Sequence, residues 1–281
     1  MKTFFLSFPR LNISLTVPIE IIADIQAAFL YSISPDTNPP PRHEYVIEST
    51  SNGFNFLKDS QLTGQFGSCL DLICRLEEDI ENTLIRTIGD WVGFHAGVVM
   101  IGDTTCVIPG NPNTGKTTTT FNLVEMGHIF LCEEVTPVDP ETFLVYPYPQ
   151  VLTLEGTYAE KYRSLYPVQN GELKILDSQM ARYRPYAVGS DPVPLKIILM
   201  PAYDTSQKPG IEELTPDRVF TELLGYCFPP NGDDEHLFDS VIRICEAAEI
   251  FRLRTNSLQS MRGLLNELFG PNPEPYEPLN P

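Results

Sequence analysis

The stretch Gly110-Asn-Pro-Asn-Thr-Gly-Lys-Thr-Thr118 decides the expected fold, because it is a complete match to the pattern G-x-x-x-x-G-K-[S/T]. A β-branched run, Thr104–Pro109, precedes it and predicts a strand. The residues that follow, 117–126, carry apolar side chains and are closed by Gly127, which predicts a helix with a glycine C-cap. Strand, loop and helix therefore follow one another in the order that a phosphate-binding loop requires.

Each part of this loop has a chemical use. The predicted phosphate-binding residues span the whole motif: Gly110, Asn111, Pro112, Asn113, Thr114, Gly115, Lys116, Thr117 and Thr118. Backbone N–H groups at a helix N-terminus form a positive concave site for phosphate oxygens. Lys116 adds charge near the β- and γ-phosphates, and the Thr117 hydroxyl is placed to bind a phosphate-bound Mg²⁺. The alternative, a glycine-rich turn that matches by chance, is disfavoured by the flanking strand and helix.

Composition restricts the classes of partner. The chain has 281 residues, 42% hydrophobic, which suffices for one large domain or two small ones. Its net charge of −18 disfavours nucleic acid and anionic membranes, since both need clustered Lys and Arg. We find no apolar run near the ~18 residues of a membrane span. The apolar start is too short for a signal peptide, and six cysteines form no C-x-x-C pair, so we expect a cytoplasmic protein with free thiols.

The first 90 residues predict a small α+β subdomain. Its expected elements are strands at 3–8 and 11–17, a helix at 18–30, a hairpin centred on 51–53, and a helix at 69–88. The last helix has the clearest pattern, a 3.6-residue apolar stripe with Ser68 as N-cap and Gly89 after its end.

The remaining residues predict a larger α/β domain, 91–269, followed by a proline-rich tail, 270–281. Its expected strands lie at 94–100, 104–109, 129–132, 195–200 and 250–253, and its helices at 117–126, 216–228, 239–246 and 257–269. Residues 143–154 look extended, although Pro147 and Pro149 exclude a regular central strand. The polar stretch 155–190 has no clear pattern.

Residues 94–154 resemble the core of the HPr kinase family. The similarity rests on His95-Ala-Gly97, the phosphate loop, and Gly127-His-Ile-Phe-Leu-Cys-Glu-Glu134, in which Glu133 stands seventeen residues after Lys116. The resemblance implies an α/β fold with a P-loop core, a mixed sheet with flanking helices, beside the N-terminal α+β subdomain. Because residues 1–90 contain no glycine-rich anion site, we expect them to recognise the acceptor or to cover the core. It implies an ATP- and Mg²⁺-dependent kinase that transfers the γ-phosphoryl group to a Ser or Thr hydroxyl of a peptide or small protein. A precursor peptide is one such acceptor, and a homo-oligomer is one option, as HPr kinases are hexamers.

The resemblance also implies roles for particular residues. Glu133 would accept the proton of the attacking hydroxyl, assisted by His95 and Lys116, while Thr117 and Glu134 would hold the metal. Arg182 and Arg184 are candidate contacts to substrate or phosphate. The alternatives are a solvated turn at the two glutamates, a hydrogen-bonded core histidine at 95, and a solvated loop for the arginines.

One departure from the family pattern keeps other functions open. The family has two adjacent aspartates where this chain has Glu133-Glu134, and the extra methylene moves a carboxylate by about 1 Å, a scale on which misplacement costs about 10²-fold in rate. A small-molecule kinase with the same core, or a catalytically weakened nucleotide-binding partner protein, therefore remain alternatives.

Overall fold

The computed structural model describes residues 1–35, 39–228 and 234–270. The chain separates into two compact units, Met1–Gly89 and Asp90–Pro281, and each is described by itself. Of the proline-rich tail predicted at 270–281, all but Gly270 lies outside the described residues. Within those ranges we find no helix whose length and apolar character would suffice to cross a membrane.

The first unit is a mixed sheet with helices packed on it. The strand order is β3-β1-β2-β4-β5-β6, and β2 and β4 run parallel while the other neighbours are antiparallel. The strands are β1 (Lys2–Phe8), β2 (Leu11–Val17), β3 (Ile33–Ser34), β4 (His43–Thr50), β5 (Gly53–Lys58) and β6 (Gln61–Phe66). The helices are η1 (Ile19–Ile21), α1 (Ile22–Ala28) and α2 (Cys69–Thr87). The predicted strands, hairpin and helices are confirmed, whereas β3 and β6 were not predicted.

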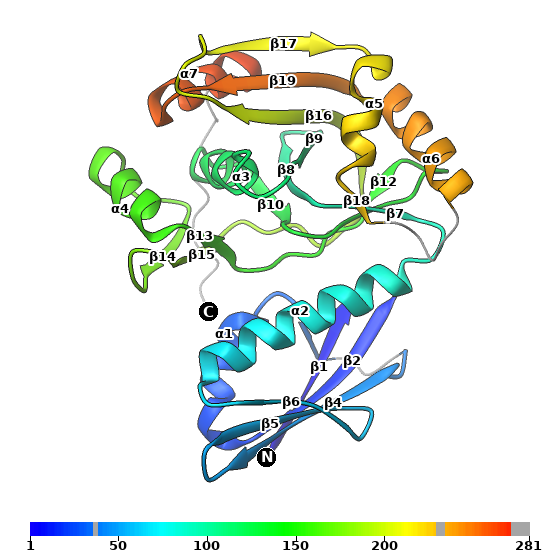
Figure 1. Cartoon of the computed structure of the whole chain (residues 1–281), viewed down its shortest axis with the longest axis vertical. Helices are drawn as coiled ribbons and strands as arrows, with labels where there is room; N and C mark the ends of the chain where they lie inside the picture. The colour runs from blue at the N-terminus through cyan, green and yellow to red at the C-terminus, as the bar shows by residue number, and fades with distance from the viewer. Residues whose placement is uncertain (36–38, 229–233, 271–281) are drawn as a thin grey trace. The chain divides into compact units, whose positions relative to one another are not determined.

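Helix α2 lies across one face of this sheet (Figure 1). Ser68 accepts a hydrogen bond from the Asp71 backbone N–H at 3.1 Å, as an N-cap residue does. Gly89, with φ of 70°, ends the helix in a conformation that glycine adopts without strain. The stripe of apolar side chains is fully buried: Leu72, Leu76, Ile80 and Leu84. The apolar periodicity therefore supplies the helix side of this unit's core.

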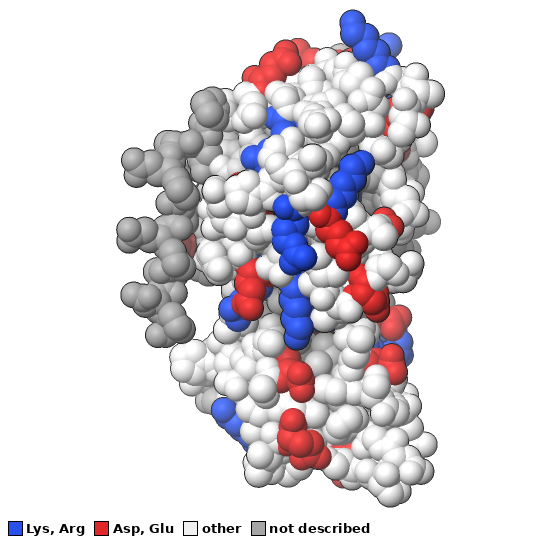
Figure 2. Space-filling view, turned by 90° about the vertical axis from the view of Figure 1, so that its left-hand side faces the viewer, with Lys and Arg blue, Asp and Glu red and all other residues white. Residues whose placement is uncertain are grey.

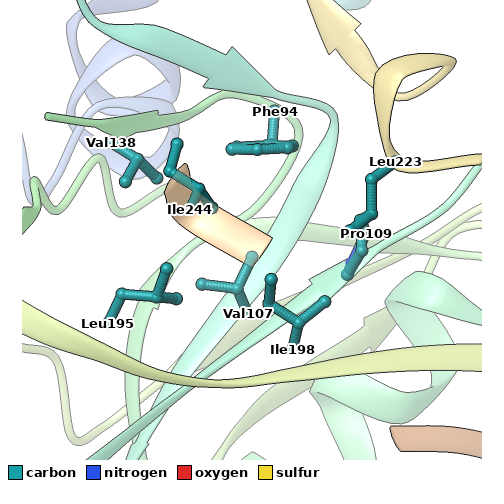
Figure 3. Close-up of a pocket in the computed structure, with 8 residues that line it drawn as sticks. All are labelled: Phe94, Val107, Pro109, Val138, Leu195, Ile198, Leu223 and Ile244. Carbon is teal, nitrogen blue, oxygen red and sulfur yellow. The ribbon is translucent and has the colours of Figure 1, made fainter. Parts of the chain in front are cut away.

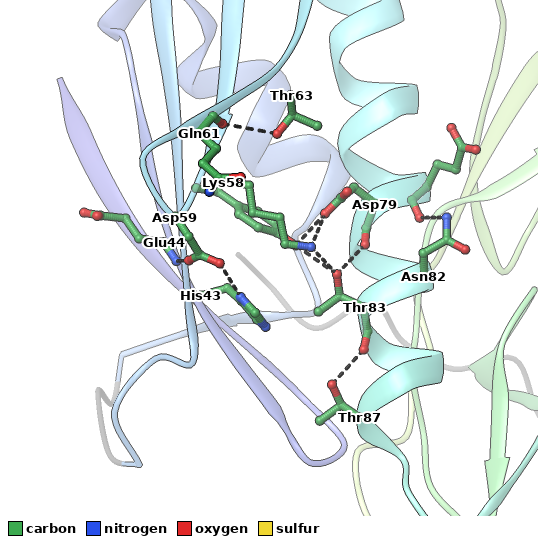
Figure 4. Close-up of polar contacts among 12 residues, drawn as sticks. His43, Glu44, Lys58, Asp59, Gln61, Thr63, Asp79, Asn82, Thr83 and Thr87 are labelled. Carbon is green, nitrogen blue, oxygen red and sulfur yellow. Dashed lines mark hydrogen bonds and ion pairs between the residues drawn. The ribbon is translucent and has the colours of Figure 1, made fainter. Parts of the chain in front are cut away.

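A polar cluster ties α2 to the strands (Figure 4). Lys58 Nζ lies 2.8 Å from Asp79 Oδ2 and 2.6 Å from Thr83 Oγ1. Tyr45 donates its hydroxyl proton to the same Asp79 oxygen at 2.7 Å. Burial would raise the pKa of Asp79, but the hydrogen bonds from Lys58 and Tyr45 outweigh it and lower the pKa. Because both charged groups have partners, the cluster fixes the helix on the sheet without burying an unpaired charge.

The second unit is built on a larger mixed sheet. Three parallel strands, β9, β16 and β19, lie side by side, and antiparallel strands flank them. The strands of this sheet are β7 (Val92–Phe94), β8 (Ala96–Ile101), β9 (Thr104–Pro109), β10 (Ile129–Cys132), β11 (Thr136–Val138), β12 (Leu144–Val145), β16 (Val193–Tyr203), β17 (Gly210–Leu214), β18 (Cys227–Phe228) and β19 (Glu249–Thr255). A separate antiparallel sheet contains β13 (Leu152–Leu154), β14 (Gly171–Ile175) and β15 (Ala181–Pro185). The predicted mixed α/β architecture is confirmed.

Helices cover both sheets of the second unit. They are α3 (Lys116–Glu125), α4 (Gly156–Leu165), α5 (Pro216–Leu224), α6 (Asp234–Ala247) and α7 (Leu258–Phe269). Helix α3 contacts the strands of the large sheet on one side and β13 of the small sheet on the other (Figure 1). Its Phe121 ring meets the rings of Tyr162 and Tyr183 edge-on, at centroid distances of 4.6 and 4.8 Å. The helix that follows the predicted phosphate loop is therefore anchored in the core, which fixes the direction of its N-terminus.

A second apolar region lies where α5 and α6 meet the large sheet. Side chains from β7, β9, β11 and β16 and from these two helices converge there (Figure 3): Phe94, Val107, Pro109, Val138, Leu195, Ile198, Leu223 and Ile244. The space that they enclose has no room for a water molecule. This packing holds β9, and with it the start of the loop, from the side opposite α3.

Three sequence-based expectations need correction. The strand predicted at 94–100 is broken at His95, because β7 and β8 belong to different pairings. The helix predicted at 216–228 ends at Leu224, after which β18 pairs with β7. The polar stretch 155–190 forms α4, β14 and β15, and β15 places Arg182 and Arg184 on a strand instead of in a loop. That strand alternates buried and partly exposed residues, a pattern too short to stand out in the sequence.

Candidate functional site

The loop between β9 and α3 has the backbone of a tight, glycine-dependent turn. Gly115 has φ of 101° and Asn113 has φ of 70°, so both lie in the left-handed region. A Cβ added at Gly110 would lie 2.4 Å from Thr114 Oγ1, a contact too close to exist. Thr114 donates its backbone N–H and its hydroxyl to the Asn111 carbonyl, at 3.2 and 2.8 Å. The loop is thus closed on itself and leads directly into Lys116, the first residue of α3.

Two carboxylates meet the lysine of this loop. They follow β10, where Glu133 is 3% exposed and Glu134 has φ of 68°. Lys116 Nζ lies 2.7 Å from Glu133 Oε1 and 2.9 Å from Glu134 Oε1. Thr117 donates its hydroxyl proton to the same oxygen of Glu133 at 2.7 Å. The cation that adjacent carboxylates require is therefore supplied by the loop itself.

His95 joins the same cluster. Its Nε2 lies 2.8 Å from Glu134 Oε2. Its backbone N–H donates to the Tyr226 carbonyl at 2.7 Å, and its carbonyl accepts from Gly110 N–H at 3.1 Å. At the break between β7 and β8, the backbone of His95 is thus hydrogen-bonded both to the start of the loop and to the segment after α5. Its imidazole is turned toward Glu134.

The electrostatics follow from this arrangement. Burial would lower the pKa of Lys116, but the charges of Glu133 and Glu134 outweigh burial and raise it. Burial would raise the pKa of Glu134, but the hydrogen bond with His95 and the charge of Lys116 lower it to about 2. Lys116 is therefore a cation and Glu134 an anion at neutral pH.

A cavity of about 590 Å³ opens onto this cluster. Its size is that of a small-molecule site. Five of the predicted phosphate-binding residues besides Lys116 and Thr117 line it, together with His95 and Glu134: Asn111, Pro112, Asn113, Gly115 and Thr118. Gly110 and Thr114, which shape the loop, are not among the described residues that line the cavity. Glu133 is not among them either, because it lies buried behind Lys116 and Thr117.

The two glutamates therefore differ in access. The Glu134 side chain is 45% exposed and faces the cavity, whereas that of Glu133 is 3% exposed. The second oxygen of Glu133, Oε2, is buried without a hydrogen-bond partner among the described residues. It lies against Gly97 of β8, where an added Cβ would come within 2.7 Å of it. In the sequence Gly97 is only the end of the motif His95-Ala-Gly97, and the structure gives the physical reason for glycine there.

Arg182 and Arg184 are not brought to this cavity. Arg184 forms an ion pair with Glu172 on the neighbouring strand β14, at 2.5 Å. Neither arginine is among the described lining residues. Figure 2 views the side of the molecule that carries α4, where Lys and Arg side chains lie among Asp and Glu. On this face the net negative charge is therefore offset locally instead of forming one acidic field.

Other lining residues come from segments that the sequence did not connect with the loop. They are Thr153, Leu154, Glu155, Tyr158, Lys161, Tyr203, Ser257, Leu258 and Met261. They lie on β13, α4, the end of β16 and α7, and at the N-cap positions of the two helices. No local sequence signal marks them, because they meet only through the tertiary fold.

The donor set fits Mg²⁺ bound together with phosphate. Hydroxyl and carboxylate oxygens are the ligands that Mg²⁺ prefers, and it commonly takes only one or two from the protein when phosphates supply others. Thr117 and Glu134, which line the cavity, provide this chemistry. The unpartnered oxygen of Glu133 lies against Gly97 and does not face the cavity. Within the described ranges, no group of three or more His, Cys, Asp and Glu side chains is arranged as a metal site made by protein alone.

Comparisons with known proteins give limited information. No protein family model matches the chain, and no curated protein matches its sequence. Among solved structures, the Hpr(Ser) kinase/phosphatase from Coxiella burnetii is similar, with a TM-score of 0.31 and 10% sequence identity. The similarity covers 63% of this chain and 95% of that chain. A similarity of this size assigns no activity to this chain.

Proposed function

We propose that the chain is an ATP-dependent phosphotransferase that uses Mg²⁺ and transfers the γ-phosphoryl group to a hydroxyl of a peptide or small protein. The observation that carries this proposal is the position of Lys116. Its Nζ contacts two carboxylates at 2.7 and 2.9 Å and lies at the wall of a cavity formed by the phosphate loop. Phosphoryl transfer needs positive charge near the transferred group, carboxylates for metal and proton, and a positioned acceptor.

The loop and Lys116 supply the first of these requirements. Lys116 is 4% exposed and its ammonium is held in place by the two glutamates, so little reorganisation is needed when phosphate enters. The free N–H groups of the first turn of α3 add a further partial positive charge. Magnesium would neutralise phosphate charge there, held by Thr117 and a glutamate.

For the two glutamates the geometry favours the opposite assignment to the one predicted from sequence. Glu133 is buried and accepts a hydrogen bond from Thr117, the predicted metal ligand, so it belongs on the metal side. Glu134 is half-exposed to the cavity and contacts His95, so in this proposal it accepts the proton of an entering hydroxyl. The charge of Lys116 is among the causes of the low pKa of Glu134, and bound phosphate would draw that charge away and make the carboxylate more basic. In this proposal His95 orients Glu134 and takes part in removing the proton.

The acceptor class rests on the resemblance of residues 94–154 to HPr kinases, which makes a serine or threonine hydroxyl the first to test. The assay incubates the protein with γ-labelled ATP and a panel of serine- and threonine-containing peptides and small proteins. Transfer to one of them supports the proposal. Transfer only to a small metabolite would indicate the small-molecule kinase instead. Binding of Mg-ATP without any transfer would indicate a nucleotide-binding partner protein.

The matched variants for this assay follow from the buried ion pair. Lys116→Ala removes the only cation that contacts Glu133 in the described structure, so the variant also loses stability. Lys116→Arg keeps the positive charge but replaces a compact ammonium by a planar guanidinium. We expect both to reduce transfer by roughly 10²–10³-fold, the size of losing one oriented donor. Lys208→Ala, at an exposed position, is the control and should keep full transfer. Full transfer by both Lys116 variants would refute the proposed function.

A further inference from the structure

Part of the cavity lining is apolar and has no use in binding phosphate. Tyr158 comes from α4, while Leu258 and Met261 come from α7. Leu258 and Met261 are 7% and 3% exposed, so only the surface that faces the cavity is open. These residues stand about 40 and 140 positions after the loop in the chain, and yet they line the same cavity as Lys116 and Thr117.

Helix α3 fixes how far this apolar wall lies from the loop. Asn122 donates an amide N–H to the Tyr158 hydroxyl at 2.8 Å, and the same nitrogen lies 3.4 Å from Met261 Sδ. Tyr158 and Met261 therefore both contact the side chain of Asn122. Asn122 stands six residues after Lys116, which is about 9 Å along a helix axis. This separation is comparable to the one between the terminal phosphates and the base of a nucleoside triphosphate.

The Tyr158 ring is held before any ligand enters. Its hydroxyl accepts a hydrogen bond from Asn122. Its ring packs edge-on against Phe121 of the core, with a centroid distance of 6.1 Å and an interplanar angle of 81°. A fixed aromatic ring stacks a planar base with little loss of conformational entropy. The exposed side chain of Lys161, one turn further along α4, adds positive charge to the same wall.

We propose that Tyr158, Leu258 and Met261 form the subsite for the base of the nucleotide, with the Tyr158 ring as its stacking surface. The ligand class is a nucleoside triphosphate, as opposed to inorganic polyphosphate or another phosphorylated donor that lacks a planar base. This inference rests on the proposed function, because it assumes that the loop binds the phosphates of the same molecule.

The test compares two variants and two ligands. Tyr158→Phe and Tyr158→Leu both lose the hydrogen bond to Asn122, but only Tyr158→Leu loses the ring. Isothermal titration calorimetry measures the affinity of each for Mg-ATP and for Mg-tripolyphosphate, which has phosphates but no base. We expect Tyr158→Leu to bind Mg-ATP about tenfold more weakly, the effect of losing one stacked base, and tripolyphosphate with unchanged affinity. Tyr158→Phe keeps the ring and its packing on Phe121, so it should bind Mg-ATP more tightly than Tyr158→Leu does.

Unchanged Mg-ATP affinity in Tyr158→Leu, or an equal loss for both ligands, would overturn the subsite. A measurement on the unaltered protein covers the case in which Tyr158→Leu does not fold. Photolabelling with 8-azido-ATP, followed by peptide mapping, should place the label within 154–161 or 257–261, and a label elsewhere overturns the inference. Failure of the proposed function looks different. If the unaltered protein binds neither Mg-ATP nor Mg-tripolyphosphate, the proposed function and the subsite fall together, whereas binding of Mg-ATP without transfer to any acceptor overturns the proposed function and leaves the subsite standing.

Discussion

Replacing Gly97 by alanine tests whether the carboxylate of Glu133 is held by close packing against β8. A Cβ at this position would lie 2.1 Å from Thr120 Oγ1, 3.1 Å from Thr120 Cβ and 2.7 Å from Glu133 Oε2. Atoms that are not bonded do not approach so closely, so either the strand or these two side chains must move. The strand has little freedom, because β8 is paired with β9 on one side and β10 on the other.

The size of the effect follows from these contacts. Added volume in a well-packed region costs about 1–3 kcal/mol, and we expect Gly97→Ala to lower the free energy of unfolding by this amount. Rotation of Thr120 would also break its hydrogen bond to the Lys116 carbonyl, 3.1 Å long, in the first turn of α3. Movement of Glu133 by about 1 Å would reduce turnover about 10²-fold.

The assay combines urea denaturation with Mg-ATP binding and acceptor phosphorylation. Gly210→Ala is the matched control, because nothing lies within 4 Å of a Cβ added there and its φ is not in the left-handed region. Gly97→Ala should be less stable than this control and slower in transfer. If Gly97→Ala is as stable and as active as Gly210→Ala, the close packing beneath Glu133 is not what positions the carboxylate.

Three further predictions concern the glutamates and the first unit. Glu134→Gln should reduce turnover about 10²–10⁴-fold and leave the Mg-ATP affinity nearly unchanged, as removal of a general base does. Glu133→Gln should mainly weaken Mg-ATP binding. The reverse pattern would restore the assignment predicted from sequence. Since the pKa of Glu134 is lowered from 4.5 to about 2, its ionised form stabilises the fold above pH 4.5 and this contribution is lost as the pH falls through 2. Unfolding free energies of the unaltered protein and Glu134→Gln should accordingly differ most near neutral pH and converge at about pH 2, and a difference independent of pH would contradict the lowered pKa. A chain that begins at Asp90, provided it remains folded, should bind Mg-ATP and lose acceptor phosphorylation if residues 1–89 recognise the acceptor; full phosphorylation would show that they do not.

Local signals predicted the elements whose conformation is set locally. The predicted succession of strand β9, loop and helix α3 was correct, because the β-branched run, the glycines and the apolar spacing that indicate it all lie within one segment. The bounds predicted for helix α2 were correct to within one residue, because its N-cap residue and its apolar stripe both lie within the segment itself. The mixed α/β class followed from the succession of such elements along the chain.

Features that depend on distant contacts were missed or left undetermined. The break at His95 depends on hydrogen bonds to Tyr226 and Gly110, and neither partner is visible from the sequence around residue 95. The cavity wall at Tyr158 and Met261 depends on their common contact with Asn122. Arg184 was predicted to lie in a loop as a candidate contact to substrate or phosphate, but it pairs with Glu172, which lies on a strand whose pattern is too short to predict.

The difference between the two glutamates has a local cause that links backbone conformation to chemistry. Neighbouring side chains on an extended strand point to opposite sides, so Glu133, directly after buried Cys132, would be followed by a residue turned away from it. At Glu134 the backbone adopts φ of 68°, a left-handed conformation that costs a non-glycine residue about 1–2 kcal/mol. A glycine there would avoid this cost but would lack the carboxylate. The contacts of Glu134 with Lys116 and His95 offset the strain, and they hold the carboxylate at the cavity wall. Strain retained at a charged residue that contacts Lys116 therefore supports the hypothesis that Glu134 has a functional role.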